Sequence, residues 1–156
     1  MDDKYFIEKA IELAVENVKS GNGGPFGAVV VKNGKIIATG VNSVTTQKDP
    51  TAHAEVTAIR NACKVLDDYQ LEGCTVYSSC EPCPMCLGAI YWARPVKLVF
   101  AASKNDAAAA GFDDDFIYAE MEKPHNLRKL KTHIIDSKNK LAPFRLWTAS
   151  SNKVDY

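Results

Sequence analysis

The chain has 156 residues, of which 46% are hydrophobic, and its 19 basic side chains balance its 19 acidic ones. This composition predicts one domain, residues 1–156, with a sizeable core, and it excludes a strong overall field toward nucleic acid or an anionic membrane. Because the charges balance, we expect a small-molecule substrate. The first residues lack a signal-peptide pattern and no apolar run reaches membrane-spanning length, so we expect a cytoplasmic protein. Five cysteines is an odd number, which favours reduced thiols over a disulfide framework.

The predicted elements alternate between helices and strands. In chain order we expect a helix from Asp2 or Asp3 to about Lys19, strands 28–31 and 36–39, a polar loop 42–50, a helix from 51 or 52, a strand 74–78, a helix 84–94 and a strand 96–101. The first two strands flank Asn33-Gly34, a dipeptide typical of a type I′ hairpin turn. After residue 102 only short helical pieces, 106–110 and 117–122, are predicted. This order favours a three-layer α/β domain.

Two short motifs provide candidate metal ligands. Cys83 and Cys86 are three residues apart, so both sulfurs face the same way on the first turn of a helix, and His53 supplies a third ligand from the helix before it. Structural zinc sites use four protein ligands, whereas catalytic sites keep three and leave one position to water. The pattern therefore predicts one catalytic zinc per chain, held between two helix N-termini at the carboxyl ends of strands.

Glu55, two residues after His53, is the predicted general acid and base. H-x-E followed by P-C-x-x-C is the signature of zinc nucleobase deaminases, and both halves are present. A buried histidine with two core cysteines is the plain alternative, but the two halves together make it much weaker. Cys80 is interpreted as a strand-end residue beside the metal, and Cys63 and Cys74 as core thiols.

Four stretches together carry a family resemblance: Gly24 to Ala28, Asp49 to Glu55, Glu81 to Cys86 and Ile90 to Arg94. They resemble the cytidine/deoxycytidylate deaminase superfamily, and residues 106–110, 111–118 and the final Tyr156 resemble the bacterial guanine deaminase branch. The resemblance implies hydrolysis of guanine to xanthine and ammonia. It also implies a five-stranded mixed sheet with helices on both faces, and a homodimer in which the C-terminal extension, residues 103–156, is exchanged.

The predicted substrate-binding residues are Phe26, Asn42, Ala54, Trp92, Asp114 and Tyr156. Phe26 would stack on the base, Trp92 would wall the pocket, and the amide of Asn42 would read a ring edge, although the two aromatic residues could be core and the asparagine could serve only its turn. Guanine carries ring N–H and amine donors, which suit a carboxylate. Asp114 is therefore the second predicted catalytic residue, with Asp113, Asp115 or a merely solvated turn as alternatives.

By resemblance, the tail from Ser150 to Tyr156 forms a lid over the partner's site, where the aromatic residue meets the purine edge; a disordered end is the plain alternative. Two other functions remain open. One is a tRNA adenosine deaminase or another nucleobase or nucleoside deaminase; the tRNA enzyme shares most of the motif, but the neutral charge argues against it. A structural zinc module would need a fourth protein ligand, for which Cys80 is the nearby candidate, and would tolerate loss of Glu55.

Overall fold

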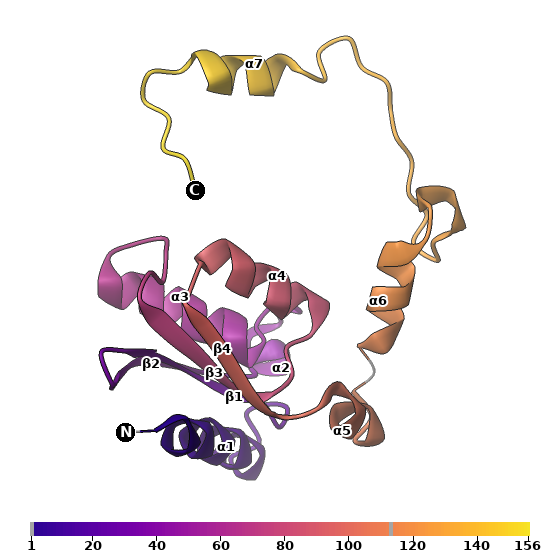
Figure 1. Cartoon of the computed structure of the whole chain (residues 1–156). Helices are drawn as coiled ribbons and strands as arrows, with labels where there is room; N and C mark the ends of the chain where they lie inside the picture. Colours follow the sequence, from indigo (N-terminus) through magenta and orange to yellow (C-terminus); the bar gives the residue numbers. More distant parts are fainter. Residues whose placement is uncertain (1, 113) are drawn as a thin grey trace. The chain divides into compact units, whose positions relative to one another are not determined.

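The computed structural model describes residues 2–112 and 114–156, which fall into two units, one ending at Asp115 and the other spanning Phe116–Tyr156. The first unit contains α1 (Asp3–Lys19), β1 (Gly27–Lys32), β2 (Lys35–Val41), α2 (Val44–Gln47), α3 (Ala54–Leu66), β3 (Cys74–Cys80), α4 (Pro84–Ala93), β4 (Lys97–Ala102) and α5 (Lys104–Ala109) (Figure 1). Then follow α6 (Asp115–Glu122), η1 (His125–Leu127) and α7 (Ala142–Ala149). Within the described residues, no helix combines the length and the apolar character needed to cross a membrane.

The first helix and the hairpin form as their sequences predict. Asp2 caps α1 by accepting a hydrogen bond from the backbone N–H of Tyr5 at 3.1 Å. Asn33 and Gly34 both have positive φ, 50° and 73°, as a type I′ turn requires. Strand β1 is central: it pairs antiparallel with both β2 and β3, while β4 adds parallel to β3. The resulting sheet has the order β2-β1-β3-β4.

Alternating side chains of the sheet build two cores. Val29, Val31 and Tyr77 face α1, where they pack with Phe6. Ala28, Val30 and Val76 face the opposite way, into a second cluster that contains residues of α3 and α4. In Figure 1, α1 accordingly lies on one side of the sheet, and α3 and α4 lie on the other. The predicted three-layer arrangement is confirmed.

Close packing fixes the start of α3 against the sheet. A Cβ atom on Gly40 in β2 would lie 2.2 Å from the carbonyl oxygen of Ala54, a distance that only a shift of the backbone could relieve. Gly40 therefore lets the first turn of α3 lie directly on the strand. This contact matters for function because the same turn begins at His53 and carries Glu55.

Three expectations about the fold are corrected. The prediction of five strands is wrong, since the sheet has four in the described residues. The chain does not continue into a fifth strand after β4, because a capping box between Ser103 and Asp106 starts helix α5 there. Helix α3 begins at Ala54 and not near residue 51, because the carboxylate of Asp49 binds the backbone N–H of Thr51 in a preceding turn. The loop after β2, predicted to be irregular, contains the single helical turn α2. Helix α7 forms in a stretch for which the sequence predicts no element.

Candidate metal centre and adjoining cavity

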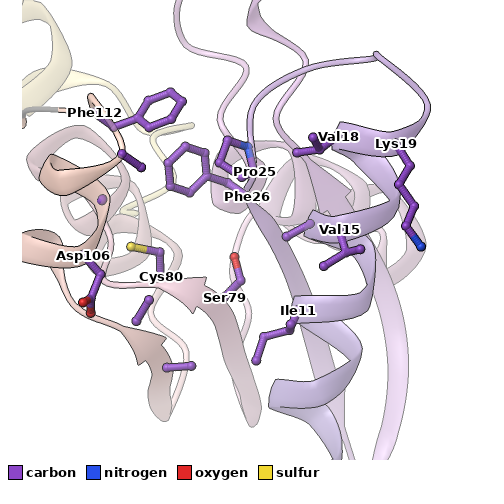
Figure 2. Close-up of a pocket in the computed structure, with 15 residues that line it drawn as sticks. Ile11, Val15, Val18, Lys19, Pro25, Phe26, Ser79, Cys80, Asp106 and Phe112 are labelled. Atoms are coloured by element: carbon purple, nitrogen blue, oxygen red, sulfur yellow. The ribbon is translucent and has the colours of Figure 1, made fainter.

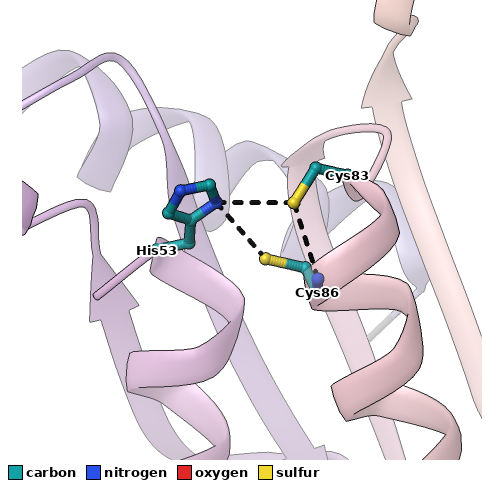
Figure 3. A group of neighbouring side chains, drawn as sticks. All are labelled: His53, Cys83 and Cys86. Carbon is teal, nitrogen blue, oxygen red and sulfur yellow. Dashed lines mark hydrogen bonds between the residues drawn. The ribbon is translucent and has the colours of Figure 1, made fainter. Parts of the chain in front are cut away.

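The three predicted ligands converge at the N-termini of two neighbouring helices. His53 is the N-cap residue of α3, and Cys83 is the N-cap residue of α4, which has Pro84 in its first turn. Cys86 lies on that same first turn and is fully buried. Figure 3 shows the imidazole from α3 and both sulfurs from α4 pointing toward one another. Both helices follow strands that end at this edge of the sheet, as predicted.

The spacing of the ligand atoms fits zinc. Nδ1 of His53 lies 3.5 Å from the Sγ atoms of both Cys83 and Cys86, and the three ligand atoms all lie within 4.8 Å of one another. A tetrahedral zinc with bonds of about 2.3 Å to sulfur and about 2.0 Å to nitrogen holds those atoms about 3.5 Å apart. Two thiols and one imidazole at these distances could therefore hold the ion without rearrangement.

The helix termini also favour negative charge on sulfur. A hydrogen bond from the Cys86 thiol lowers the pKa of Cys83 to about 4, and His53 together with the backbone N–H of Cys86 contributes. The same hydrogen bond and burial raise the pKa of Cys86, so the pair shares one proton. The hydrogen bond with Cys83 raises the pKa of His53. A cation bound here favours thiolate on both cysteines, which helps to explain why two sulfurs are placed at one helix N-terminus.

Cys80 does not belong to this group of ligand atoms. Its thiol donates to the carbonyl oxygen of Ser103 at 3.6 Å, and burial raises its pKa to about 11. Among the described residues, the cluster able to hold a metal consists of His53, Cys83 and Cys86 alone. Three protein ligands leave a tetrahedral ion one open position, which is the pattern of a catalytic and not a structural site.

Glu55 stands beside the ligands and is 6% exposed. Its Oε1 accepts a hydrogen bond from the hydroxyl of Ser78 at 3.2 Å. Burial raises the pKa of the Glu55 carboxyl above its usual range. A carboxyl group with a raised pKa can both accept and return a proton near neutral pH, as a general acid and base must.

A cavity of about 440 Å³ opens over the ligands. It is lined by Gly23, Gly24, Phe26, Asn42, Val44, Thr45, His53, Glu55, Glu81, Cys83, Phe112 and Asp114. At one wall the ring of Phe26 packs edge to face against Phe112, with 4.9 Å between ring centres. Its size and its mixture of apolar walls and polar groups suit one small planar heterocycle.

A larger apolar cavity, of about 560 Å³, lies between α1, the ends of β3 and β4, and α5 (Figure 2). It shares the Phe26 and Phe112 walls with the first cavity but contains neither His53 nor Glu55. Its lining is dominated by side chains such as Ile11 and Val15. The smaller cavity is the one that contains the buried carboxyl of Glu55 and two of the three candidate metal ligands, His53 and Cys83, so the chemistry is assigned to it.

The aspartate run is only partly described. Asp114 lines the smaller cavity, and its negative charge contributes to the raised pKa of His53. Asp115 forms an ion pair with Lys104, at 3.0 Å between Oδ1 and Nζ. Asp113 lies outside the described residues. Of the two aspartates that the structure describes, Asp114 is therefore the one that faces the site.

Two of the predicted substrate contacts, Ala54 and Trp92, do not line the cavity. The side chain of Ala54 is completely buried in the core between the sheet and α3. Trp92 is 64% exposed on α4 and does not line the cavity, because the buried side of that helix is occupied by Ile90 and Ala93. Within one chain it does not wall the pocket. Tyr156 belongs to the second unit, so its role at the site stays a prediction.

Several lining residues escaped the sequence reasoning. Thr45 and Val44 enter the wall through the short helix α2, and Glu81 enters from the turn between β3 and α4. Glu81 stands next to the P-C-x-x-C motif, so its position was a usable signal. No spacing pattern marks Val44 and Thr45, because they stand in a mostly polar loop without helical or strand periodicity.

The comparisons with known proteins agree with this geometry. Residues 1–102, which include all three ligands and Glu55, match the family model described as the cytidine and deoxycytidylate deaminase zinc-binding region. The guanine deaminase of Bacillus subtilis is 57% identical over 156 residues, covering all of both chains. The X-ray structure of that relative superimposes with a TM-score of 0.98 over 100% of this chain and 99% of the other. A tRNA-specific adenosine deaminase from Buchnera aphidicola is 41% identical over 85% of each chain.

Proposed function

Because this chain belongs to the cytidine and deoxycytidylate deaminase family, we propose that it hydrolyses guanine to xanthine and ammonia, using one zinc ion per chain. The observation that carries the choice of base is the 57% identity to a guanine deaminase over the whole chain, including residues 103–156 beyond the shared zinc-binding region. The match to the adenosine deaminase is lower and covers less of the chain.

The described residues divide the work of the reaction. Zinc bound by His53, Cys83 and Cys86 supplies Lewis acidity, which lowers the pKa of water to roughly 7. Glu55 takes one proton of the attacking water and gives it to a ring nitrogen. It then takes the second proton of the same water and gives it to the amine, which leaves as ammonia while the oxygen becomes the new carbonyl. The hydroxyl of Ser78 holds the Glu55 carboxyl in place at 3.2 Å. Burial keeps bulk water away from this proton transfer.

The cavity walls select a planar base. Phe26 offers a ring for stacking, and its contact with Phe112 at 4.9 Å restricts how far that ring can turn. Asn42 is 9% exposed and brings its amide to the cavity from the end of β2. An amide at this position can form hydrogen bonds with one polar edge of the purine.

Asp114 is proposed to read the donors of guanine and to help move its protons. Guanine presents a ring N–H and an amine where adenine presents a ring acceptor, so a carboxylate favours guanine. The support is that Asp114 lines the same cavity as Glu55, whereas Asp115 is paired with Lys104.

Asp114→Asn should lower the kcat for guanine at least about tenfold, because an amide accepts a hydrogen bond but cannot transfer a proton. Asp115→Asn is the matched control: it breaks a surface ion pair, whose contribution is small, and should change turnover less than about twofold. Steady-state kinetics and thermal melting of both variants, with Asp113→Asn beside them, make the comparison. Equal and small effects at all three positions would mean that the three consecutive aspartates form only a solvated turn.

The choice of substrate is tested by release of ammonia from guanine, adenine, cytosine, their nucleosides and a tRNA anticodon stem-loop. We expect guanine to be turned over far faster than any other compound. Preferred turnover of the tRNA substrate would instead support the adenosine deaminase function, and a lack of turnover of every compound would leave a structural zinc module.

We also propose that residues 103–156 extend one deaminase domain and are exchanged between the subunits of a homodimer. Helices α6 and α7 contain no buried residue, and α7 exposes Phe144, Leu146 and Trp147. The second unit, of only 41 residues, Phe116–Tyr156, exposes too much apolar surface to be stable alone, which supports its packing on a partner subunit. Tyr156 would then cover the partner's cavity.

A chain that ends at Ser150 should keep its zinc and secondary structure but lose most guanine deamination, because the lid that excludes water is missing. Mixing it with Glu55→Gln chains and refolding them together should restore about a quarter of the wild-type activity, since about half of the dimers then contain one complete site. Full activity of the shortened chain alone would contradict the proposal that the tail forms a lid. Failure of the mixture to regain activity would contradict the proposal that the C-terminal segments are exchanged.

The thiols support a cytoplasmic location. All five cysteines are free, and two of them are needed as metal ligands. Thiols persist in this form in reducing compartments.

A further inference from the structure

Asn17 is a polar residue on the otherwise apolar buried face of α1. It lies on the inner face of α1 with 3% of its surface exposed, in line with the buried residues Phe6, Ala10 and Ala14. Its Nδ2 donates two hydrogen bonds, to the carbonyl oxygens of Gly24 at 2.8 Å and Asn42 at 2.9 Å. Within the described residues, its Oδ1 is buried with no hydrogen-bond partner.

The orientation of this amide is fixed by chemistry. Turning it over would place Oδ1 against two carbonyl oxygens, which all accept hydrogen bonds and repel one another. A leucine of similar size would avoid burying an unpaired acceptor, so stability alone does not explain an asparagine here. What the asparagine adds is a pair of donors that ties two separate segments together.

Both tied segments form the wall of the active-site cavity. Gly24 and Asn42 line it, although they are 18 residues apart in the chain. The backbone N–H of Gly24 donates to Oδ1 of Asn42 at 3.3 Å, and a Cβ on Gly23 would lie 2.1 Å from the Asn42 carbonyl oxygen. The close approach of the two backbones thus depends on glycine and is closed by Asn17.

We call the two hydrogen bonds from Asn17 to Gly24 and Asn42 the Asn17 clamp. The clamp determines which end of the Asn42 amide can hydrogen-bond to a ligand. Its Oδ1 accepts from the N–H of Gly24 and, at 3.5 Å, from the N–H of Val44. Within residues 2–112 and 114–156, its Nδ2 has no protein partner and remains as the donor for a ligand in the cavity. A shift of the Gly24 loop would release Oδ1 and let the amide rotate.

We propose that Asn17 is a positioning residue for base recognition, which holds Gly24 against Asn42 so that Nδ2 of Asn42 is presented to the purine. The inference rests on the proposed deaminase function. Asn17 does not line the cavity and so acts through Asn42. Glu55 and the metal ligands come from α3 and α4 and not from the clamped segments. Loss of the clamp should therefore weaken binding of the base and leave proton transfer nearly unchanged.

A double-mutant cycle on the zinc-loaded full chain tests this. Asn17→Leu should raise the KM for guanine about tenfold and change kcat less than about twofold. In an Asn42→Ala background the same substitution should raise KM less than about twofold, because the group that it positions is gone. Should Asn17→Leu fail to fold, Asn17→Ser, which keeps one donor, enters the same cycle. Equal effects on KM in both backgrounds, or no effect on KM, would overturn the proposal.

Asn61→Leu is the matched control. Asn61 also donates through Nδ2 to a backbone carbonyl, that of Thr39 at 2.9 Å, but it lies outside the cavity lining, so its replacement should leave KM unchanged. Hydrogen exchange of the Gly24 amide provides a readout that needs no turnover, and it should quicken in Asn17→Leu but not in Asn61→Leu. If the wild-type chain releases no ammonia from guanine, the proposed deaminase function is wrong, but the hydrogen-exchange measurement still tests the clamp. An unchanged hydrogen-exchange rate of the Gly24 amide in Asn17→Leu would refute the clamp.

Discussion

Replacing Glu55 by glutamine is expected to lower guanine turnover by about two to four orders of magnitude while the chain keeps its zinc and its fold. Glutamine has nearly the same shape, and its carbonyl oxygen can still accept the hydroxyl hydrogen of Ser78. It cannot take a proton from water or return one to the base. Since Glu55 is buried with a raised pKa, removing its charge should not lower the stability of the chain.

The measurement combines ammonia release, metal content and circular dichroism. Glu81→Gln is a suitable control, because Glu81 is a second carboxylate that lines the same cavity. Its Oε2 accepts a hydrogen bond from the backbone N–H of Lys104 at 2.9 Å. The same chemical change there should cost far less turnover. Near-normal activity of Glu55→Gln would rule out the proposed proton transfer and would favour a zinc ion that is only structural.

The second large effect concerns the metal itself. Cys83→Ser should lose its zinc and with it nearly all deamination, because a hydroxyl is a poor ligand where a thiolate is needed. Cys80→Ser should retain about one zinc per chain, since the Cys80 thiol is protonated and bonded to the carbonyl oxygen of Ser103. Elemental analysis of both dialysed variants decides between them. If Cys80→Ser lost its metal and Cys83→Ser kept it, the ligand assignment would be wrong.

The sequence was informative wherever chemistry depends on local spacing. His53, Cys83 and Cys86 could be chosen as ligands because each stands at or next to a helix start, and helix starts have local signals such as Pro84. The hairpin followed from Asn33-Gly34, whose backbone conformation few other residues adopt. These features need no knowledge of distant contacts.

Features that depend on packing between distant segments could not be predicted. Trp92 looked like a pocket wall because it is aromatic and near the motif, but the side of α4 that is buried is set by its contact with α3 and the sheet. The sequence carries no local signal that marks Asn17. Its importance depends on two carbonyl groups that meet it only in the folded chain. The fifth strand is implied only by the family resemblance, since the sequence shows no strand pattern after residue 102.

The most direct test of the account is the origin of the oxygen in the product. Zinc-loaded protein should be incubated with guanine in water enriched in heavy oxygen, and the products should be analysed by mass spectrometry. Hydrolytic deamination predicts xanthine that has gained one heavy oxygen in place of the amino group, together with an equal amount of ammonia, and neither product from the Glu55→Gln chain. Guanine recovered unchanged, or xanthine without the label, would contradict the proposed reaction.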